Sequence, residues 1–119
     1  VITVALVISL SATALAHEGD LDMYGGHYVL SEDFEVQLDY HIHRDRRTND
    51  KKQLSSLNQL SRKYQKLKDY ETAAMIRYLM NDEDGSMRYF RWALRADKKR
   101  RMIIRKRQYA VEKVFARIK

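Results

Sequence analysis

The stretch LSSLNQLSRKYQKLKDYETAAMIRYL, residues 54–79, decides the fold class of this chain. In its first half, apolar side chains recur every three or four residues, which is the period of one helix face. They are Leu54, Leu57, Leu60, Tyr64 and Leu67. A corner is expected at Asp69, whose carboxylate can cap a second helix, and Ala73 and Ala74 let neighbouring helices approach closely. We therefore predict a helical hairpin over residues 49–80.

The chain beyond this hairpin is also expected to be helical, because the sequence contains no proline. A polar loop at residues 81–86 separates the hairpin from a long basic helix predicted over 86–118, which Ser86 can cap. The apolar stripe of this helix is interrupted at 97–101, where we expect it to kink or to extend beyond the hairpin. The predicted fold is mainly α, a helical hairpin plus a long C-terminal helix, with a small loop or β-hairpin module at residues 17–48.

Residues 1–16, VITVALVISLSATALA, carry no charge and end in an A-x-A cleavage pattern. This composition is typical of a secretory signal peptide cleaved after Ala16, and we expect the mature protein in the periplasm or outside the cell. Once cleaved, it is not expected to be an integral membrane protein, since no apolar run reaches the roughly 20 residues of a membrane span. The alternatives are a short buried helix or strand, or an uncleaved anchor.

Charge divides the 119-residue chain, which is long enough for one domain. Residues 17–50 hold nine acidic and three basic side chains, whereas residues 51–119 hold seven acidic and 20 basic ones. The two segments can attract each other, or each can face a different partner. The absence of cysteine excludes a disulfide scaffold, a thiolate zinc site and a cysteine nucleophile.

All four histidines lie in the acidic segment. The sequence LDYHIH at 38–43 predicts a short strand, on which His41 and His43 share one face because side chains alternate. Such an H-x-H pair can bind one metal ion, and His27, just after a Gly-Gly turn, can supply a third imidazole. The candidate metal ligands are His17, His27, His41, His43, Asp20 and Asp22.

Imidazole and carboxylate ligands suit a divalent metal, and we expect zinc ahead of copper. A metal would also stabilise the acidic segment, which is too short to bury an adequate core of its own. If cleavage follows Ala16, the free α-amine and the imidazole of His17 can together chelate copper. The alternative is that the histidines are solvated or hydrogen-bonded surface residues.

The same segment resembles the small exported YHYH-type domain, whose pattern is H-x-G-x-x-D-x-x-G-[GC]-H, then a short turn, then Y-H-x-H. The matching positions are His17, Gly19, Asp22, Gly25, His27, Tyr40, His41 and His43. The spacer of 13 residues after His27 is longer than the usual turn of that family, and Gly26 and Ile42 stand where some members carry cysteine. The resemblance implies an exported module for which metal binding is the usual expectation, and it implies no reaction.

Residues 60–79 resemble the UVR motif, a helical hairpin with the core D-[FY]-E-x-A-A-x-x-R-D. Asp69, Tyr70, Glu71, Ala73, Ala74 and Arg77 match, whereas Tyr78 stands where that family has Asp. In that family the hairpin pairs with another hairpin and carries no catalytic residue. The resemblance implies self-association or a protein partner, contacted through Leu60, Tyr64, Leu67, Tyr70, Ala73, Ala74 and Arg77. A generic helical hairpin uses the same pair of alanines.

The stretch KKRRMIIRKR, residues 98–107, holds seven basic residues in ten. Such a run is expected to bind a polyanion, which is a nucleic acid, a cell-wall polymer or an anionic lipid surface. The candidate contacts are Lys98, Lys99, Arg100, Arg101, Arg105, Lys106 and Arg107. The alternative is a solvated helix face whose long side chains cover apolar neighbours.

An enzyme is not expected. The sequence lacks H-E-x-x-H, G-x-S-x-G, a P-loop and a Gly-rich dinucleotide turn, and the acidic segment offers little wall for a substrate pocket. We predict an exported, non-catalytic metal-binding protein with a helical protein-interaction module. The first alternative is a polyanion-binding helical protein. The second is a small metal-dependent hydrolase that uses the histidines with a carboxylate base, Asp39 or Glu18.

Overall fold

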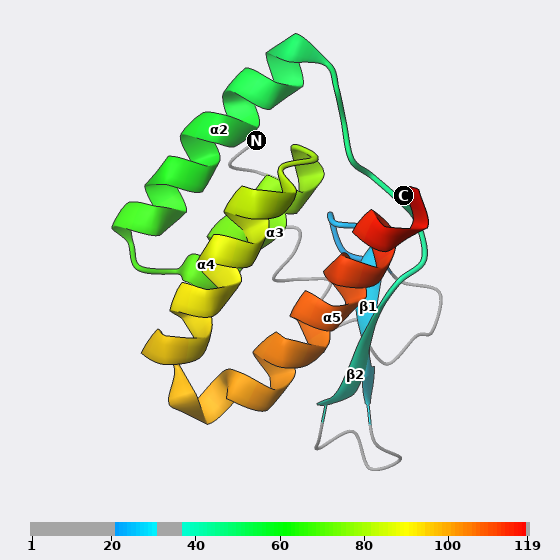
Figure 1. Cartoon of the computed structure of the whole chain (residues 1–119), viewed down its shortest axis with the longest axis vertical. Coiled ribbons are helices and arrows are strands. Elements are labelled where there is room, and N and C mark those ends of the chain that lie inside the picture. The colour runs from blue at the N-terminus through cyan, green and yellow to red at the C-terminus, as the bar shows by residue number, and fades with distance from the viewer. Residues whose placement is uncertain (1–20, 31–36, 119) are drawn as a thin grey trace.

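The computed structural model describes residues 21–30 and 37–118, and within them the chain is mainly helical (Figure 1). Two strands form a small antiparallel sheet, and the helices follow them along the chain. The elements are β1 (Gly26–Leu30), β2 (Gln37–Ile42), α2 (Lys51–Lys66), α3 (Tyr70–Leu79), α4 (Glu83–Ala96), the 3-10 helix η2 (Lys98–Arg100) and α5 (Arg101–Ile118). This arrangement confirms the predicted fold class, including the long C-terminal helix.

The predicted helical hairpin is formed by α2 and α3. Its corner uses Lys68 at φ 62°, and the Asp69 carboxylate accepts a hydrogen bond from the backbone N–H of Thr72 at 3.2 Å, as a helix N-cap does. Helix α3 packs against both α2 and α4, so it is the central helix of the fold. Ala73 and Ala74 are fully buried, because their small side chains let both neighbours approach.

The prediction of a single helix over residues 86–118 is wrong, because the structure has two α-helices there, α4 and α5, with the short η2 between them. Helix α4 begins three residues earlier, where the Asp82 carboxylate accepts from the Gly85 N–H at 3.0 Å. Ser86 is therefore not a cap: its buried hydroxyl donates to the Ala74 carbonyl oxygen at 2.9 Å. At Asp97 the backbone leaves the helical region, and the Asp97 carboxylate caps η2 by accepting from the Arg100 N–H. The break turns α5 back, so that the apolar stripes of both helices face the core.

The sheet lies against α5, as Figure 1 shows. Its register pairs His27 with His41 and Tyr28 with Tyr40. One face of the sheet carries tyrosine and isoleucine side chains toward the helices, and buried Tyr24, Tyr40 and Ile42 join the same hydrophobic cluster as the helical core. The described part of the N-terminal module therefore shares its core with the helices.

The predicted signal segment, residues 1–16, lies outside the described residues. Among the helices of the described ranges, none is both long enough and apolar enough to cross a membrane.

Candidate functional site

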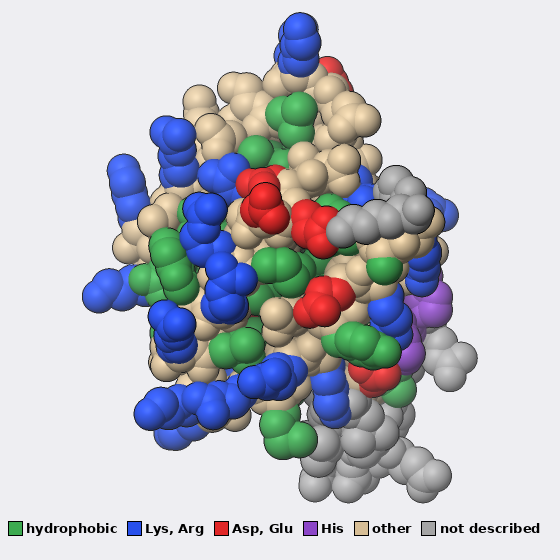
Figure 2. Space-filling view, viewed as in Figure 1, with side chains coloured by type: hydrophobic (Ala, Val, Ile, Leu, Met, Phe, Trp, Pro, Cys, Tyr) green, Lys and Arg blue, Asp and Glu red, His purple; other side chains and the backbone are tan. Residues whose placement is uncertain are grey.

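Three imidazoles gather on the outward face of the sheet. His27 comes from β1, His41 from β2, and His43 follows directly after β2. The ring centroids lie 4.7 Å apart for His27 and His43, 6.0 Å for His41 and His43, and 6.3 Å for His27 and His41. Figure 2 shows histidine side chains together at one edge of the molecule. We call these three residues the histidine triad.

The triad is held in place by the tight turn between Asp22 and Gly26. Gly25 adopts φ 84°, a conformation that side-chain-bearing residues rarely take, and its carbonyl oxygen accepts from the N–H groups of His43 and Arg44 at 2.9 and 3.0 Å. These two hydrogen bonds extend the pairing past the end of β2. His43 is thereby kept on the same face as His41, as strand alternation predicts.

The Nε2 atoms of His27 and His43 lie 2.8 Å apart. When both rings are neutral, one Nε2 carries the proton and donates to the other. His41 lies on the open side of the triad, where its Nε2 is 3.6 Å from Asp39 Oδ2 and its side chain is 44% exposed. His27, in contrast, is 9% exposed. The triad thus combines a fixed pair of nitrogens with a third imidazole that has room to rotate.

The spacing of the triad is close to what one metal ion requires. Three imidazoles on a tetrahedral zinc, with Zn–N near 2.0–2.1 Å, place their ring centroids about 5 Å apart. Within residues 21–30 and 37–118, no group of three or more His, Cys, Asp or Glu side chains is already arranged to hold a metal ion. His41 would therefore have to turn away from Asp39 and toward the His27–His43 pair.

The other predicted ligands are not part of this cluster. His17 and Asp20 lie outside the described residues. The structure contradicts the prediction for Asp22, whose carboxylate is used within the fold. Its Oδ1 accepts from the N–H groups of Tyr24 and Gly26 at 2.9 and 3.0 Å, and its Oδ2 accepts from the Tyr40 hydroxyl at 2.6 Å. Asp22 closes the turn that precedes β1, so its oxygens are not available to a metal on the opposite face.

Arg107 holds the inner face of the sheet to the helices. Its guanidinium lies 4.7 Å from the ring centroid of Tyr40, 5.1 Å from that of Tyr24 and 5.4 Å from that of Tyr28. It also donates to Glu71 Oε2 at 2.9 Å and to Asp22 Oδ2 at 3.3 Å. The prediction that Arg107 contacts a polyanion is therefore wrong, because its side chain is buried and already paired. Arg100 also pairs with Glu71 and is only partly available.

This buried cluster shifts the pKa values of its members. Burial raises the pKa of the Tyr24, Tyr28 and Tyr40 hydroxyls, and the nearby Arg107 only partly offsets it. Burial also acts to raise the pKa of the Glu71 carboxyl, but the charges and hydrogen bonds of Arg107 and Arg100 outweigh it and hold that pKa below its usual value. Glu71 is therefore ionised and the tyrosines neutral at pH 7.

Sequence reasoning missed Glu71 and Arg107 as partners, since 36 positions separate them and no local pattern connects them. The only signal was that Glu71 lies in the first turn of a helix, YETAAMIRYL, in which most of the residues are buried. An acidic side chain among residues that are mostly buried requires a basic partner from elsewhere in the chain.

The residues predicted to form a partner-binding hairpin are mostly used inside the fold. Ala73 and Ala74 have no exposed surface, which contradicts their prediction as partner contacts. Arg77 donates from Nε to Ser61 Oγ at 2.9 Å and so ties α3 to α2. Leu60, Tyr64 and Tyr70 are partly buried against the core, whereas Leu67 is 63% exposed.

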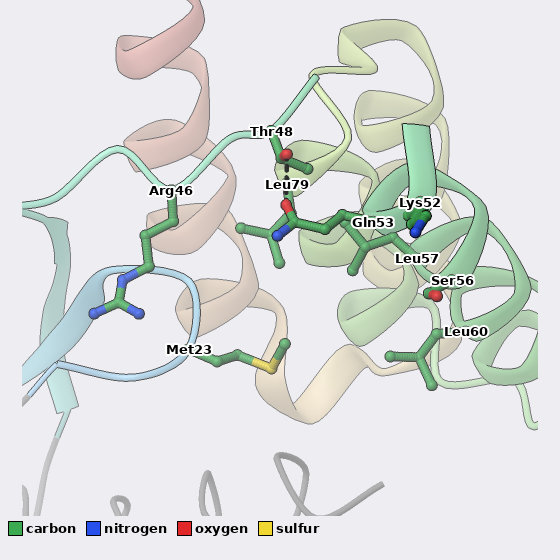
Figure 3. A pocket seen from close by; sticks show the side chains of 9 residues that line it. All are labelled: Met23, Arg46, Thr48, Lys52, Gln53, Ser56, Leu57, Leu60 and Leu79. Carbon is green, nitrogen blue, oxygen red and sulfur yellow. Dashed lines mark hydrogen bonds between the residues drawn. The ribbon is translucent and has the colours of Figure 1, made fainter. Parts of the chain in front are cut away.

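An apolar hollow of about 550 Å³ opens beside α2 (Figure 3). Met23 enters it from the N-terminal turn, and Leu57, Leu60 and Leu79 line it from α2 and α3. At its rim, the Thr48 hydroxyl donates to Gln53 Oε1 at 2.6 Å. No histidine lines this hollow, so it is separate from the triad.

The remaining predicted polyanion contacts lie at the corner between α4 and α5. Lys98, Lys99, Arg101 and Arg105 are exposed, and Lys106 is partly exposed. Figure 2 shows Lys and Arg side chains over much of this face, including its lower edge, where Figure 1 places the corner.

No known protein family matches the chain, and no curated protein or solved structure matches it significantly. The resemblances to the YHYH-type domain and to the UVR motif therefore remain predictions.

Proposed function

We propose that this protein binds a divalent metal ion, zinc ahead of copper, through His27, His41 and His43. The observation that carries the proposal is the convergence of three imidazoles, with two Nε2 atoms 2.8 Å apart, on one face of a strand pair. Neutral imidazole nitrogens are good ligands for both ions. The ion would replace the shared proton between His27 and His43 and draw in His41.

The packing beneath the triad favours a binding site whose backbone is in place before the metal binds. Tyr40 directly precedes His41 in the sequence. Its side chain is 1% exposed and packs against Arg107. The backbone of β2 is therefore fixed by core contacts, so only side-chain rotation is needed on binding. Ligands placed on rigid elements bind metal more tightly than ligands that must first be ordered.

We propose that this role is non-catalytic. His41 and His43 of the triad are not buried, and the hollow beside α2 has no histidine in its lining. A hydrolase would need a walled pocket beside the metal and a carboxylate aimed at its bound water. Asp39 instead lies 3.6 Å from His41 Nε2. The apolar composition of residues 1–16 supports an exported location for this metal-binding protein.

Calorimetric titration with zinc tests the proposal. The wild-type chain, freed of any affinity tag, is expected to bind one equivalent, and the double variant His41→Ala/His43→Ala is expected to lose tight binding while keeping its helical circular dichroism. Asp39→Asn serves as the matched control, because it changes the neighbouring carboxylate and leaves all three imidazoles. Stoichiometric tight binding in the double variant would refute the site.

A second candidate function is a protein contact at the hollow beside α2. It is supported by the apolar lining that Leu57, Leu60 and Met23 leave open. A second copy of the chain is the simplest partner, and sedimentation analysis of wild type and Leu57→Asp tests it. Self-association lost in the variant supports the contact, and a monomeric wild type at high micromolar concentration refutes it.

A further inference from the structure

Four arginines frame a hollow of about 310 Å³ between α4 and α5. Arg91 and Arg95 come from α4, Arg101 and Arg105 come from α5, and Leu94 forms an apolar side of the hollow. We call this group the arginine seam. Two of its members, Arg91 and Arg95, lie outside the basic run that the sequence singles out, and the fold brings them to it.

The seam arginines have no ion pair with an acidic residue, unlike the arginines that join elements of the fold. Elsewhere, Arg47 pairs with Asp45, Arg77 with Asp82, and Arg107 with Glu71. By contrast, no side-chain hydrogen bond or ion pair joins a seam arginine to any other residue in the part of the chain that the structure describes. The four seam arginines are therefore exposed to solvent and are not neutralised by a carboxylate of the described residues.

The local sequence also provides no helical neighbour of opposite charge. Positions three and four residues away from Arg91, Arg95 and Arg105 hold no acidic residue. Asp97 precedes Arg101 by four residues, but its carboxylate caps η2 through the Arg100 N–H. The spacings Arg91–Arg95 and Arg101–Arg105 place like charges one helical turn apart, which is unfavourable on a helix. An anion in the seam would relieve this repulsion.

The chemistry of the seam favours phosphate. A guanidinium presents a planar set of donors that matches two oxygens of one phosphate, whereas an ammonium acts as a point charge. All four charged groups of the seam are guanidinium groups. The exposed cations of α2 are mostly lysines instead: Lys51, Lys52, Lys63 and Lys66.

An exposed aromatic ring lies next to the seam on α5. Tyr109 is 60% exposed and follows Arg105 by one helical turn, so both side chains lie on the outward face of the helix. Single-stranded nucleic acids are bound by this combination, a basic groove that follows the backbone and an aromatic ring on which a base stacks. A lipid surface requires a broad apolar face, whereas the outward face of α5 exposes only Met102 and Tyr109 as large apolar side chains among the described residues.

We propose that the arginine seam binds the backbone phosphates of single-stranded nucleic acid, with one base stacked on Tyr109. This proposal does not depend on the histidine triad, which lies on the sheet and shares no residue with the seam. Recognition is independent of sequence, because every contact in it is to a phosphate or to the flat face of a base.

Fluorescence anisotropy with a short, labelled, single-stranded oligonucleotide of mixed sequence tests the proposal on the full chain. The variants Arg91→Gln/Arg95→Gln and Arg101→Gln/Arg105→Gln are each expected to weaken binding about tenfold at low salt. The slope of log K against log salt is expected to fall by about 1.4, since each phosphate contact on a single strand contributes about 0.7. Lys51→Gln/Lys52→Gln removes the same charge from α2 and is the matched control, with less than about a twofold effect.

Two further variants separate the proposed contacts from general charge attraction. Replacing all four seam arginines with lysine keeps the charge and is expected to weaken binding by losing the two-oxygen contacts. Tyr109→Leu is expected to weaken binding to the oligonucleotide, whereas Tyr109→Phe is not. Equal losses in the seam and α2 variants would overturn the proposal. It would also be overturned if anionic phospholipid vesicles bound through the seam while the oligonucleotide did not.

Discussion

The Nη1 atom of Arg107 donates to Oε2 of Glu71 at 2.9 Å, and the two side chains are only 11% and 7% exposed. This ion pair joins α5 to α3, and Nη2 of Arg107 donates to Asp22 in the turn before the histidine-bearing sheet. The proposed metal site therefore depends on a charge in the core of the helical part. The stability of the fold and the geometry of the histidine triad are expected to change together when this charge is removed.

Replacing Arg107 with methionine is expected to destabilise the protein by about 3 kcal/mol or more. The change leaves the Glu71 and Asp22 carboxylates buried without their basic partner, which is the costly way to break a buried ion pair. Urea unfolding followed by circular dichroism measures the difference. Arg105→Met, two residues earlier on the exposed face, is the control and should change stability by less than about 0.5 kcal/mol. Equal stability of the two variants would contradict the role of Arg107.

The lowered pKa of Glu71 predicts a loss of stability in acid. Because the pKa is lower in the folded state, Glu71 contributes stability that is fully present above its unfolded value of about 4.3 and is lost as the pH falls through the folded value. The free energy of unfolding of Glu71→Gln should therefore be about 2 kcal/mol lower than that of wild type at pH 7. This difference between the two proteins should become smaller below about pH 4. Urea midpoints measured from pH 7 to pH 2 check this. A gap that stays constant over that range would show that the Glu71 charge plays no part.

The raised pKa values of the buried tyrosines predict a loss of stability in alkali. Burial raises the pKa of Tyr78 to about 12, and it raises those of Tyr24, Tyr28 and Tyr40 as well. Below their pKa in the unfolded state, about 10, these neutral hydroxyls stabilise the folded state. This stabilisation is lost as the pH rises toward their pKa values in the folded state. Tyrosinate absorbance is expected to show these four groups ionising together with unfolding. Their ionisation at about pH 10 in a still-folded protein would disagree with the burial.

The helices and the short strand could be predicted from the sequence, because both depend on local periodicity. The cap at Asp69 and the shared face of His41 and His43 follow from the same kind of reasoning. The break at Asp97 was visible only as an interrupted apolar stripe, because whether the helix bends or ends there depends on how its two halves pack. The gathering of His27 with His41 depends on strand register, which the pattern of either strand alone does not determine.

Contacts between distant charges could not be predicted. In the sequence, Arg107 is one of seven basic residues in the ten-residue stretch 98–107. Only the three-dimensional fold shows that it lies among Tyr24, Tyr28 and Tyr40. The role of Asp22 was mistaken for the same reason. A carboxylate near histidines in sequence suggests a metal ligand, but this one satisfies the backbone of its own turn and the Tyr40 hydroxyl.

Replacing Gly25 with alanine is expected to disrupt the turn that positions His43. Gly25 has φ 84°, and a Cβ there would clash with the carbonyl oxygen of Arg44. We expect a loss of about 2 kcal/mol or more in stability, together with weaker zinc binding. Thermal unfolding and calorimetric titration of the same sample measure both effects, with Ala96→Ser at the exposed end of α4 as the neutral reference. Unchanged zinc affinity in the Gly25 variant would show that this turn does not position a ligand.

The most direct test of the metal site is a residue-specific NMR measurement of the imidazole nitrogens during zinc titration. We expect one equivalent of zinc to shift an imidazole nitrogen resonance of His27, His41 and His43 together and to leave the backbone signals of α2 in place. If those three imidazoles keep their metal-free shifts while zinc binds, or if no zinc binds at micromolar concentration, the histidine triad is not a metal site.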